Sequence, residues 1–485
     1  NTNFSWIDEL SSDVPTIGHM LREQGYYTAF KGKWHCSELS LSEDALERYG
    51  FSDYQQWGEM FGAPLQGAQL DGTVAFETID WLENKAPKLD QPWLLISSMI
   101  NPHDIMFFQS DPIEEPHTEG AINGLQTTEQ RLGWFEKRWD VSLPENFEDD
   151  FELQPYGVRS YKENIDKNYG KVPDDREDLW LKRRNYLINA MRLVDSEFNK
   201  ILEAMDRLNL WEDTIVIFTG DHGEMNGAHR MTQKGAIPFD EATVVNLTVC
   251  VPGGPQGKRT NAVGSHLDLA PTILDFAGLE EKKMASRYPH LKGRSLKSVI
   301  LKPGQDGPRG SEDSPGDGAL ICWDGLNMLD HEWSLSGALK ELTDMGSGPR
   351  APLDVHMENL KKAGEKYGAP DFSKRTFFRA VVDGQYKLVR WFSPEEYGNP
   401  STLQELYEQG EVALYDLTND PGELENIGHP DHPDHNPMLV EQMLTKMHAL
   451  VEKELGEDMV PFNLDMFGTR EVKYHKEEAE SSAGE

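Results

Sequence analysis

Cysteine, long apolar runs and basic side chains are all scarce in this 485-residue sequence. Its three cysteines are Cys36, Cys250 and Cys322, and none belongs to a Cys-x-x-Cys pair. This odd, scattered set predicts neither a disulfide framework nor a zinc ribbon. No run approaches the roughly 18 to 20 apolar residues that a helix needs to span a bilayer, so we expect no membrane partner.

Acidic side chains outnumber basic ones by 84 to 47, which gives a formal net charge of -37. Because nucleic acids are polyanions, this balance argues against a nucleic-acid partner. A protein this acidic can bind an anion only at a focused positive site, built from a metal ion and a few Lys, Arg or His side chains. Clusters of such residues are therefore the candidate functional sites.

One such cluster follows an apolar segment at residues 215–218, which we predict to be a strand buried on both faces. Five polar residues occur within the fourteen positions that begin at Asp221: Asp221, His222, Glu224, His229 and Lys234. Any one of them could belong to a solvated loop. Together they favour a site, because Asp221 and His222 at the end of a strand can bind one cation. Lys234 could hold an anion beside that cation.

Two earlier segments repeat the pattern of a helix, a strand and then polar residues. The predicted strand at 26–30 leads to Lys33 and His35, and the predicted strand at 93–99 leads to His103. A surface turn is the alternative interpretation for Lys33 and His35. Alternating helices and strands predict an α/β fold with a mostly parallel central sheet flanked by helices. The carboxyl ends of its strands, and with them the polar residues, would share one edge.

Five motifs occur in an order that resembles the sulfatase family of the alkaline-phosphatase superfamily, between residues 15 and 427. They are GYYTAFKGKWH, NPHD, TGDHGEMNGAH with its following lysine, SHLDLAPTILDFAGL, and RAVVDGQYKLVRWF with LYDLTNDPGELENI. The resemblance implies hydrolysis of small-molecule or saccharide sulfate esters. It also implies an alkaline-phosphatase-like α/β domain and a smaller C-terminal α+β subdomain with an antiparallel sheet.

The resemblance also implies roles for individual residues. Asp221 and His222 correspond to half of the family's metal site, with Ca²⁺ as the expected cation and Mn²⁺ as the alternative. Many sulfatases have Asn at the second position, and His is more typical of choline-sulfatase-like and phosphonate-hydrolase-like members. Lys33 and Lys234 resemble the two lysines that hold the sulfate oxygens.

Two histidines resemble the family's proton-transfer groups. His35 corresponds to the histidine that deprotonates the hydrated formylglycine nucleophile, and His103 to the one that protonates the leaving alcohol. Fixed cations beside them would stabilise the charge that spreads over the sulfuryl oxygens. We interpret His229 as a supporting or structural residue and Glu224 as a loop or helix-cap residue.

The family's nucleophile motif is missing from the sequence. None of the three cysteines begins a Cys-x-Pro-x-Arg stretch, no Ser-x-Pro-x-Arg stretch occurs, and no Asp-Asp pair precedes His35. We therefore expect the formylglycine and the remaining metal ligands in a segment upstream of this chain. A phosphodiesterase or phosphonate monoester hydrolase on the same scaffold is one alternative. A catalytically dead homologue that only binds anions is another.

Composition suggests where the domains divide. Residues 302–318 are rich in Pro, Gly and acidic side chains, so we interpret them as a linker or loop between a catalytic domain at 1–301 and a C-terminal subdomain at 319–485. Within the latter, turn chemistry predicts a hairpin at 377–392, and apolar spacing predicts a helix at 437–455. Four residues could line the substrate side of the cleft or simply pack: Trp323, Asp324, His331 and Arg379.

Overall fold

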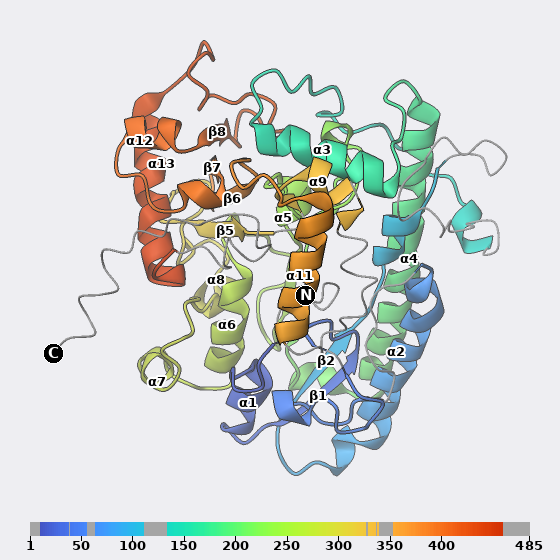
Figure 1. Cartoon of the computed structure of the whole chain (residues 1–485). Helices are drawn as coiled ribbons and strands as arrows, with labels where there is room; N and C mark the ends of the chain where they lie inside the picture. Colours follow the sequence, from blue (N-terminus) through green and yellow to red (C-terminus); the bar gives the residue numbers. More distant parts are fainter. Residues whose placement is uncertain are drawn as a thin grey trace.

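The structure is a computed structural model that describes residues 10–37, 39–55, 64–110, 133–325, 328–335, 337–338 and 353–458. Figure 1 shows the arrangement of its elements. The helices are α1 (Ile17–Arg22), α2 (Gln66–Asn84), α3 (Tyr156–Tyr169), α4 (Glu177–Arg207), α5 (Asp240–Thr243), α6 (Leu269–Phe276), α7 (Glu281–Arg287), α8 (Lys297–Leu301), α9 (His331–Leu335), α11 (Leu353–Tyr367), α12 (Leu403–Glu408) and α13 (Pro437–Leu450). The strands are β1 (Tyr27–Gly32), β2 (Trp93–Ser98), β3 (Val216–Thr219), β4 (Leu247–Cys250), β5 (Ala319–Trp323), β6 (Phe377–Val382), β7 (Tyr386–Phe392) and β8 (Glu411–Asp416).

The strands of the N-terminal half form two separate pairs. β1 pairs in parallel with β2, with Tyr27 opposite Trp93, which confirms the parallel arrangement predicted for these two helix-strand units. β3 instead pairs antiparallel with β4, with Val216 opposite Cys250. Within the described residues no hydrogen-bonded strand joins the two pairs. The structure is therefore α/β, with part of a central sheet.

Helices cover both faces of the β1-β2 pair. On one face, Trp81 of α2 and Ile201 of α4 pack with Ala29 of β1 in one apolar cluster. On the other face, Met20 of α1 and Leu274 of α6 belong to a second cluster that contacts β2. Figure 1 shows α2 and α4 side by side along one flank of the molecule, away from α6. Side chains alternate between faces along a strand, so each helix layer buries one set.

Two details differ from the sequence predictions. The segment at 215–218 was predicted to be buried on both faces, yet Phe218 is 41% exposed. The cause is the wide cavity that β3 borders, described below. No helix was predicted within residues 104–175, but this region contains α3, whose Val158, Tyr161 and Ile165 are buried against the C-terminal sheet. Its polar composition hid that apolar face. Residues 111–132 lie outside the described part of the chain.

The C-terminal strands form a four-stranded antiparallel sheet in the order β5-β6-β7-β8. The predicted hairpin is confirmed as β6 and β7, and Asp383 closes its turn by accepting hydrogen bonds from the amides of Gln385 and Tyr386. α13 covers one face of this sheet. The other face packs against Ile237 and Phe239, which follow the predicted site residue Lys234 in the chain. The sheet thus supports one wall of the site.

The Pro- and Gly-rich segment at residues 302–318 is neither wholly buried nor wholly exposed. Arg309 and Ser311 are buried, whereas residues 312–315 are exposed, so this segment runs partly inside the protein. Among the described helices, none is both long and apolar enough to span a bilayer.

Candidate active site

A cavity of about 1800 Å³ opens at the carboxyl ends of β1, β2 and β3. All six residues that the sequence nominated line it: Lys33, His35, His103, Asp221, His222 and Lys234. They come from three chain segments far apart in sequence. Because parallel strands bring their carboxyl ends to a common edge, the fold places these segments together.

Gly32 shapes the turn that presents Lys33 and His35. It has a φ of +91°, and a Cβ atom at this position would lie 2.0 Å from the carbonyl oxygen of Ser98. A side chain is therefore excluded where β1 passes β2 and where the Lys33 amide donates to the same Ser98 oxygen over 2.9 Å. Trp34, between the two residues, packs against Tyr49 and Phe51.

The imidazoles of His35 and His103 lie in strongly cationic surroundings. Burial, reinforced by Lys33, lowers the pKa of His35 to about 4. Burial lowers the pKa of His103 to about 2, with Lys234 and Lys33 acting in the same direction. Both rings are thus neutral at pH 7 before an anion arrives. The Nδ1 atom of His103 is buried and makes no hydrogen bond within the described part of the chain.

Lys234 is held by a loop that Glu224 organises. Oε1 of Glu224 accepts hydrogen bonds from the amide of Gln233 at 2.8 Å and from Nη2 of Arg183 at 3.1 Å. Burial lowers the pKa of Lys234, Glu224 opposes that shift, and Lys33 adds to it. Glu224 is therefore a buried partner of the cationic cluster rather than a simple loop or cap residue. Its position soon after Asp221-His222 was the available signal.

His229 is buried beneath the same loop. Its Nδ1 lies 2.7 Å from Oδ2 of Asp149, its Nε2 lies 3.1 Å from Nδ2 of Asn146, and its ring stacks on Phe239 with the centroids 3.7 Å apart. Both ring nitrogens are thus engaged inside the protein, away from the cavity lining. This placement agrees with the structural interpretation of His229.

Asp221 and His222 present ligand atoms to the cavity. The side chain of Asp221 is 84% exposed, and Nδ1 of His222 lies 2.9 Å from the carbonyl oxygen of Gly223. The ring must donate from Nδ1 to that oxygen, which leaves Nε2 as the nitrogen able to bind a metal. The described residues contain no group of three or more His, Cys, Asp or Glu that could hold a metal ion. They therefore fit two ligands of a cation site and not a complete one.

A family model described as Sulfatase matches residues 1–279, which is more than half of the chain. The chain belongs to the sulfatase family. It is 24% identical over 342 residues to the uncharacterised sulfatase YidJ of Escherichia coli K12, covering 62% of this chain and 60% of that protein. It is 24% identical over 436 residues to a choline-sulfatase of Rhizobium meliloti, covering 81% of this chain and 78% of that protein. The chain thus spans less than two thirds of the first of these relatives.

Solved structures give the same fold. One is a protein in complex with its substrate D-glucosamine-2-N,6-O-disulfate, which matches with a TM-score of 0.60 and 15% sequence identity. The match covers 94% of this chain and 85% of that chain. The chain thus shares the fold of this solved structure over most of its length.

His266 is a cavity residue that the sequence analysis did not nominate. Its Nε2 lies 2.9 Å from the carbonyl oxygen of Gly220, the residue before Asp221, and its side chain lines the cavity. In the sequence analysis it stands within the SHLDLAPTILDFAGL motif, without a role of its own. The Ser265-x-x-Asp268 capping box, which begins a helix, was the signal that the residue between them is rigidly presented.

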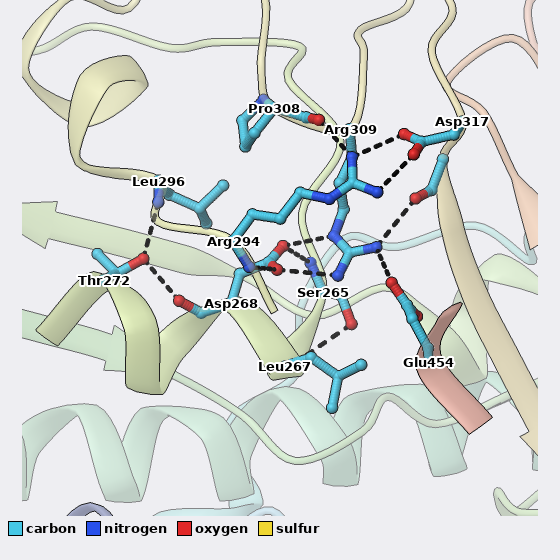
Figure 2. Close-up of polar contacts among 11 residues, drawn as sticks. Ser265, Leu267, Asp268, Thr272, Arg294, Leu296, Pro308, Arg309, Asp317 and Glu454 are labelled. Atoms are coloured by element: carbon cyan, nitrogen blue, oxygen red, sulfur yellow. Dashed lines mark hydrogen bonds and ion pairs between the residues drawn. The ribbon is translucent and has the colours of Figure 1, made fainter. Parts of the chain in front are cut away.

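A buried ionic network fixes the helix start that carries His266 (Figure 2). The Asp268 carboxylate accepts hydrogen bonds from the amides of Ser265 and Arg294, and from Nε and Nη2 of Arg309 at 2.7 and 2.9 Å. Nη1 of Arg309 reaches Glu454 at 2.7 Å, near the end of the described chain. The network therefore ties the segment behind Asp221 to residues 302–318 and to the turn that follows α13.

Four residues considered for the substrate side are not among the residues that line the cavity. Arg379 is buried and donates to Asp324, Asp458 and Tyr397. His331 is buried, with Nδ1 3.0 Å from the hydroxyl of Ser160. The ring of Trp323 lies near Gly235, beside Lys234. Their described contacts are those of packing residues.

Behind the polar mouth, the cavity is a deep apolar space between β2 and β3. Leu95 of β2 and Ile217 of β3 line opposite sides, and Met191 of α4 and Ile273 of α6 line it from the two helix layers. Met191 is 52% exposed, which is unusual for an apolar residue inside a helix-sheet sandwich. The space is bordered by two strands of the partial central sheet and by the helices on both of its faces.

Proposed function

We propose that this chain is the larger part of a sulfuric ester hydrolase that acts on a small-molecule or saccharide sulfate ester. The observation that carries the proposal is the meeting of Lys33, Lys234, His35 and His103 at one cavity mouth. In a protein of net charge -37, two lysines that meet at one mouth, beside two neutral imidazoles, form a focused positive site able to hold an anion. Membership in the sulfatase family supports the same reaction.

In this proposal, each residue has a role that its surroundings suit. Lys33 and Lys234 hold the sulfuryl oxygens and stabilise the charge that grows on them in the transition state. His35, whose pKa is lowered to about 4, is a neutral base that accepts a proton from the nucleophile. Metal ligation by Asp221 and His222 would polarise the nucleophile and the sulfate, with Ca²⁺ expected first and Mn²⁺ second.

His103 must be protonated to act on the leaving alcohol, yet burial and two lysines lower its pKa to about 2. A bound sulfate ester would act against this shift, because it brings negative charge beside Lys33 and Lys234. That charge offsets the lysines and raises the pKa of His103 in the complex. Substrate binding and proton uptake by His103 are thus coupled.

The nucleophile completes the proposal. The full sequence of 485 residues contains neither a Cys-x-Pro-x-Arg nor a Ser-x-Pro-x-Arg stretch. We infer that formylglycine and the remaining metal ligands lie on a segment upstream of residue 1. An extended segment placed between β2 and β3 would fill the apolar space and join the two strand pairs into one mostly parallel sheet. Its carboxyl end would then meet Lys33 and His103.

The test compares residues 1–485 alone with the same polypeptide extended upstream, each assayed with Ca²⁺ on an activated aryl sulfate and the matching aryl phosphonate monoester. We expect the extended protein to hydrolyse the sulfate ester and the shorter protein to be inactive. Comparable activity of the shorter protein would rule out the upstream formylglycine. Faster hydrolysis of the phosphonate would favour the alternative that the Asp221-His222 pair suggests. Sulfate binding without any turnover would indicate an anion-binding homologue.

A further inference from the structure

Two buried carboxylates connect α2 with the loop that carries His103. Asp71 reaches from α2 to the loop, and Asp104 reaches from the loop to α2. Asp71 of α2 accepts hydrogen bonds from the amides of Ile100 and Asn101, at 2.6 and 3.0 Å. Asp104 of the loop accepts from the amides of Gly67 and Ala68 of α2, at 3.0 and 2.8 Å. Each segment therefore supplies the carboxylate that satisfies backbone donors of the other.

Both contacts are buried and well matched. Asp71 is 1% exposed and Asp104 is 0% exposed, so their hydrogen bonds are shielded from water. The Asp104 carboxylate contacts the N-terminus of α2, a 19-residue helix, and the dipole of that helix favours a negative charge there. Burial raises the pKa of both carboxyl groups, that of Asp71 to about 7, and the backbone donors act against that shift.

The start of α2 and the loop approach each other closely at Gly67, where a side chain would collide with Asn101. A Cβ atom on Gly67 would lie 2.6 Å from the side chain of Asn101. The approach brings the first turn of α2 against the loop, so both carboxylates can reach their amides. This close contact limits how far the loop can move toward or away from α2.

His103 lies between the two points of attachment. Asn101, two residues before it, is held by Asp71, and Asp104, one residue after it, is held by α2. The His103 amide donates to the Ile100 carbonyl at 3.1 Å, within the same turn. Its buried Nδ1 makes no hydrogen bond within the described residues. Within the described residues the ring is therefore oriented through its backbone and packing and not through a hydrogen bond at Nδ1.

We propose that Asp71 and Asp104 are positioning residues that hold His103 at the depth required to reach the leaving oxygen. The proposal rests on the role assigned to His103 above. A displacement of about 1 Å in a reacting group can cost on the order of 100-fold in rate. Loss of either carboxylate contact should therefore reduce proton donation while leaving the lysines that hold the sulfate in place.

The kinetic test uses Asp104→Asn and Asp71→Asn in the N-terminally extended enzyme. An amide keeps the size of the side chain but turns one acceptor into a donor that faces a backbone N–H. We expect kcat for an alkyl sulfate, a poor leaving group, to fall roughly 10- to 100-fold. Turnover of a nitrophenyl sulfate, whose leaving group needs little protonation, should change less than about threefold. Asp80→Asn, an exposed carboxylate on the same helix, is the matched control and should leave both rates unchanged.

A second measurement does not depend on sulfatase activity. Diethyl pyrocarbonate modifies accessible neutral imidazoles, and mass spectrometry reports the rate at His103. We expect both variants to raise that rate severalfold relative to wild type and Asp80→Asn, with His290, an exposed histidine, as the internal reference. Asp104→Glu keeps the charge but displaces the carboxylate, so it should behave as Asp104→Asn does.

The outcomes separate this proposal from the proposed function. If the wild-type protein hydrolyses no sulfate ester, the proposed function fails, while the modification rates still judge the carboxylate contacts. An equal loss for the two classes of ester would overturn the positioning role, because it would indicate general damage. Unchanged modification of His103 in all three Asp71 and Asp104 variants would also overturn it. If Asp71→Asn does not fold, the two Asp104 variants decide the question.

Discussion

Two clusters of charged side chains lie inside this protein, and they are built in opposite ways. Around Arg309, every charge faces its opposite, since Asp268 and Glu454 accept from a guanidinium that is 0% exposed. Although burial disfavours its charge, hydrogen bonds to Asp268 raise the pKa of Arg309. Around Lys234, cations converge, and burial together with Lys33 lowers its pKa. The first cluster secures the fold, and the second is suited to an anion that arrives later.

Breaking the Arg309 cluster should have the largest effect on stability. Arg309→Met would leave Asp268 and Glu454 buried without their shared cation, which we expect to lower the free energy of unfolding by about 3 to 5 kcal/mol. Urea unfolding monitored by tryptophan fluorescence would measure it. Arg294→Met is the matched control, because its partner Asp317 is 42% exposed and the loss should stay near 1 kcal/mol. Equal losses for the two variants would contradict the comparison.

Removing the lysine of the second cluster should change activity and not stability. Lys234→Met in the extended enzyme removes a half-buried cation that faces Lys33 as well as Glu224, so we expect the unfolding free energy to change little. Turnover of aryl and alkyl sulfates should fall alike, by about 100- to 1,000-fold, because the lost charge stabilises the sulfuryl group itself. The measurements are kcat/KM for both esters and the urea midpoint. A large loss of stability would show that Lys234 is a structural ion-pair partner instead.

The two clusters also show what the sequence could and could not predict. Lys33, His103 and Asp221 were predictable because each follows an apolar strand, and the parallel topology then determines that they meet. Arg309 was not predictable in this way. It lies in a Pro- and Gly-rich segment that suggested an exposed linker, and its partners Asp268 and Glu454 are separated from it by 41 and 145 residues. No local pattern encodes such a pairing.

The same distinction between local and distant signals applies to the fold. Local signals were sufficient for the parallel pair of β1 and β2, for the β6-β7 hairpin and for α13, since apolar spacing and turn residues determine them. The antiparallel pairing of β3 with β4 and the helix α3 depend on contacts with distant segments. Glu224 and His266 were underestimated for the same reason, because their partners Arg183 and Gly220 become neighbours only in the folded chain.

Acid should weaken the protein through the second cluster. The pKa of His103 is lowered to about 2 in the folded state, against a usual value near 6.5, so the unfolded chain binds one more proton between these values. The contribution of His103 to the free energy of unfolding is therefore fully present above pH 6.5. It is lost as the pH drops, by at most about 1.4 kcal/mol per pH unit. Urea midpoints at pH 7, 6 and 5 would show a shallower decline for His103→Gln. An identical pH dependence in the variant would remove His103 from the buried cationic cluster.

The smallest effect is expected where opposite charges pair in water. Arg207 of α4 and Glu83 of α2 lie 2.8 Å apart, and their side chains are 57% and 40% exposed. Solvent and salt screen this pair, and ordering two long side chains offsets much of the attraction, so Glu83→Gln should cost between about 0 and 1 kcal/mol. The loss should shrink further in 1 M NaCl, whereas the loss from Arg309→Met should persist, since its ions are shielded from the solvent. If both losses declined together with salt, burial would not be what separates the Arg309 cluster from an ordinary surface ion pair.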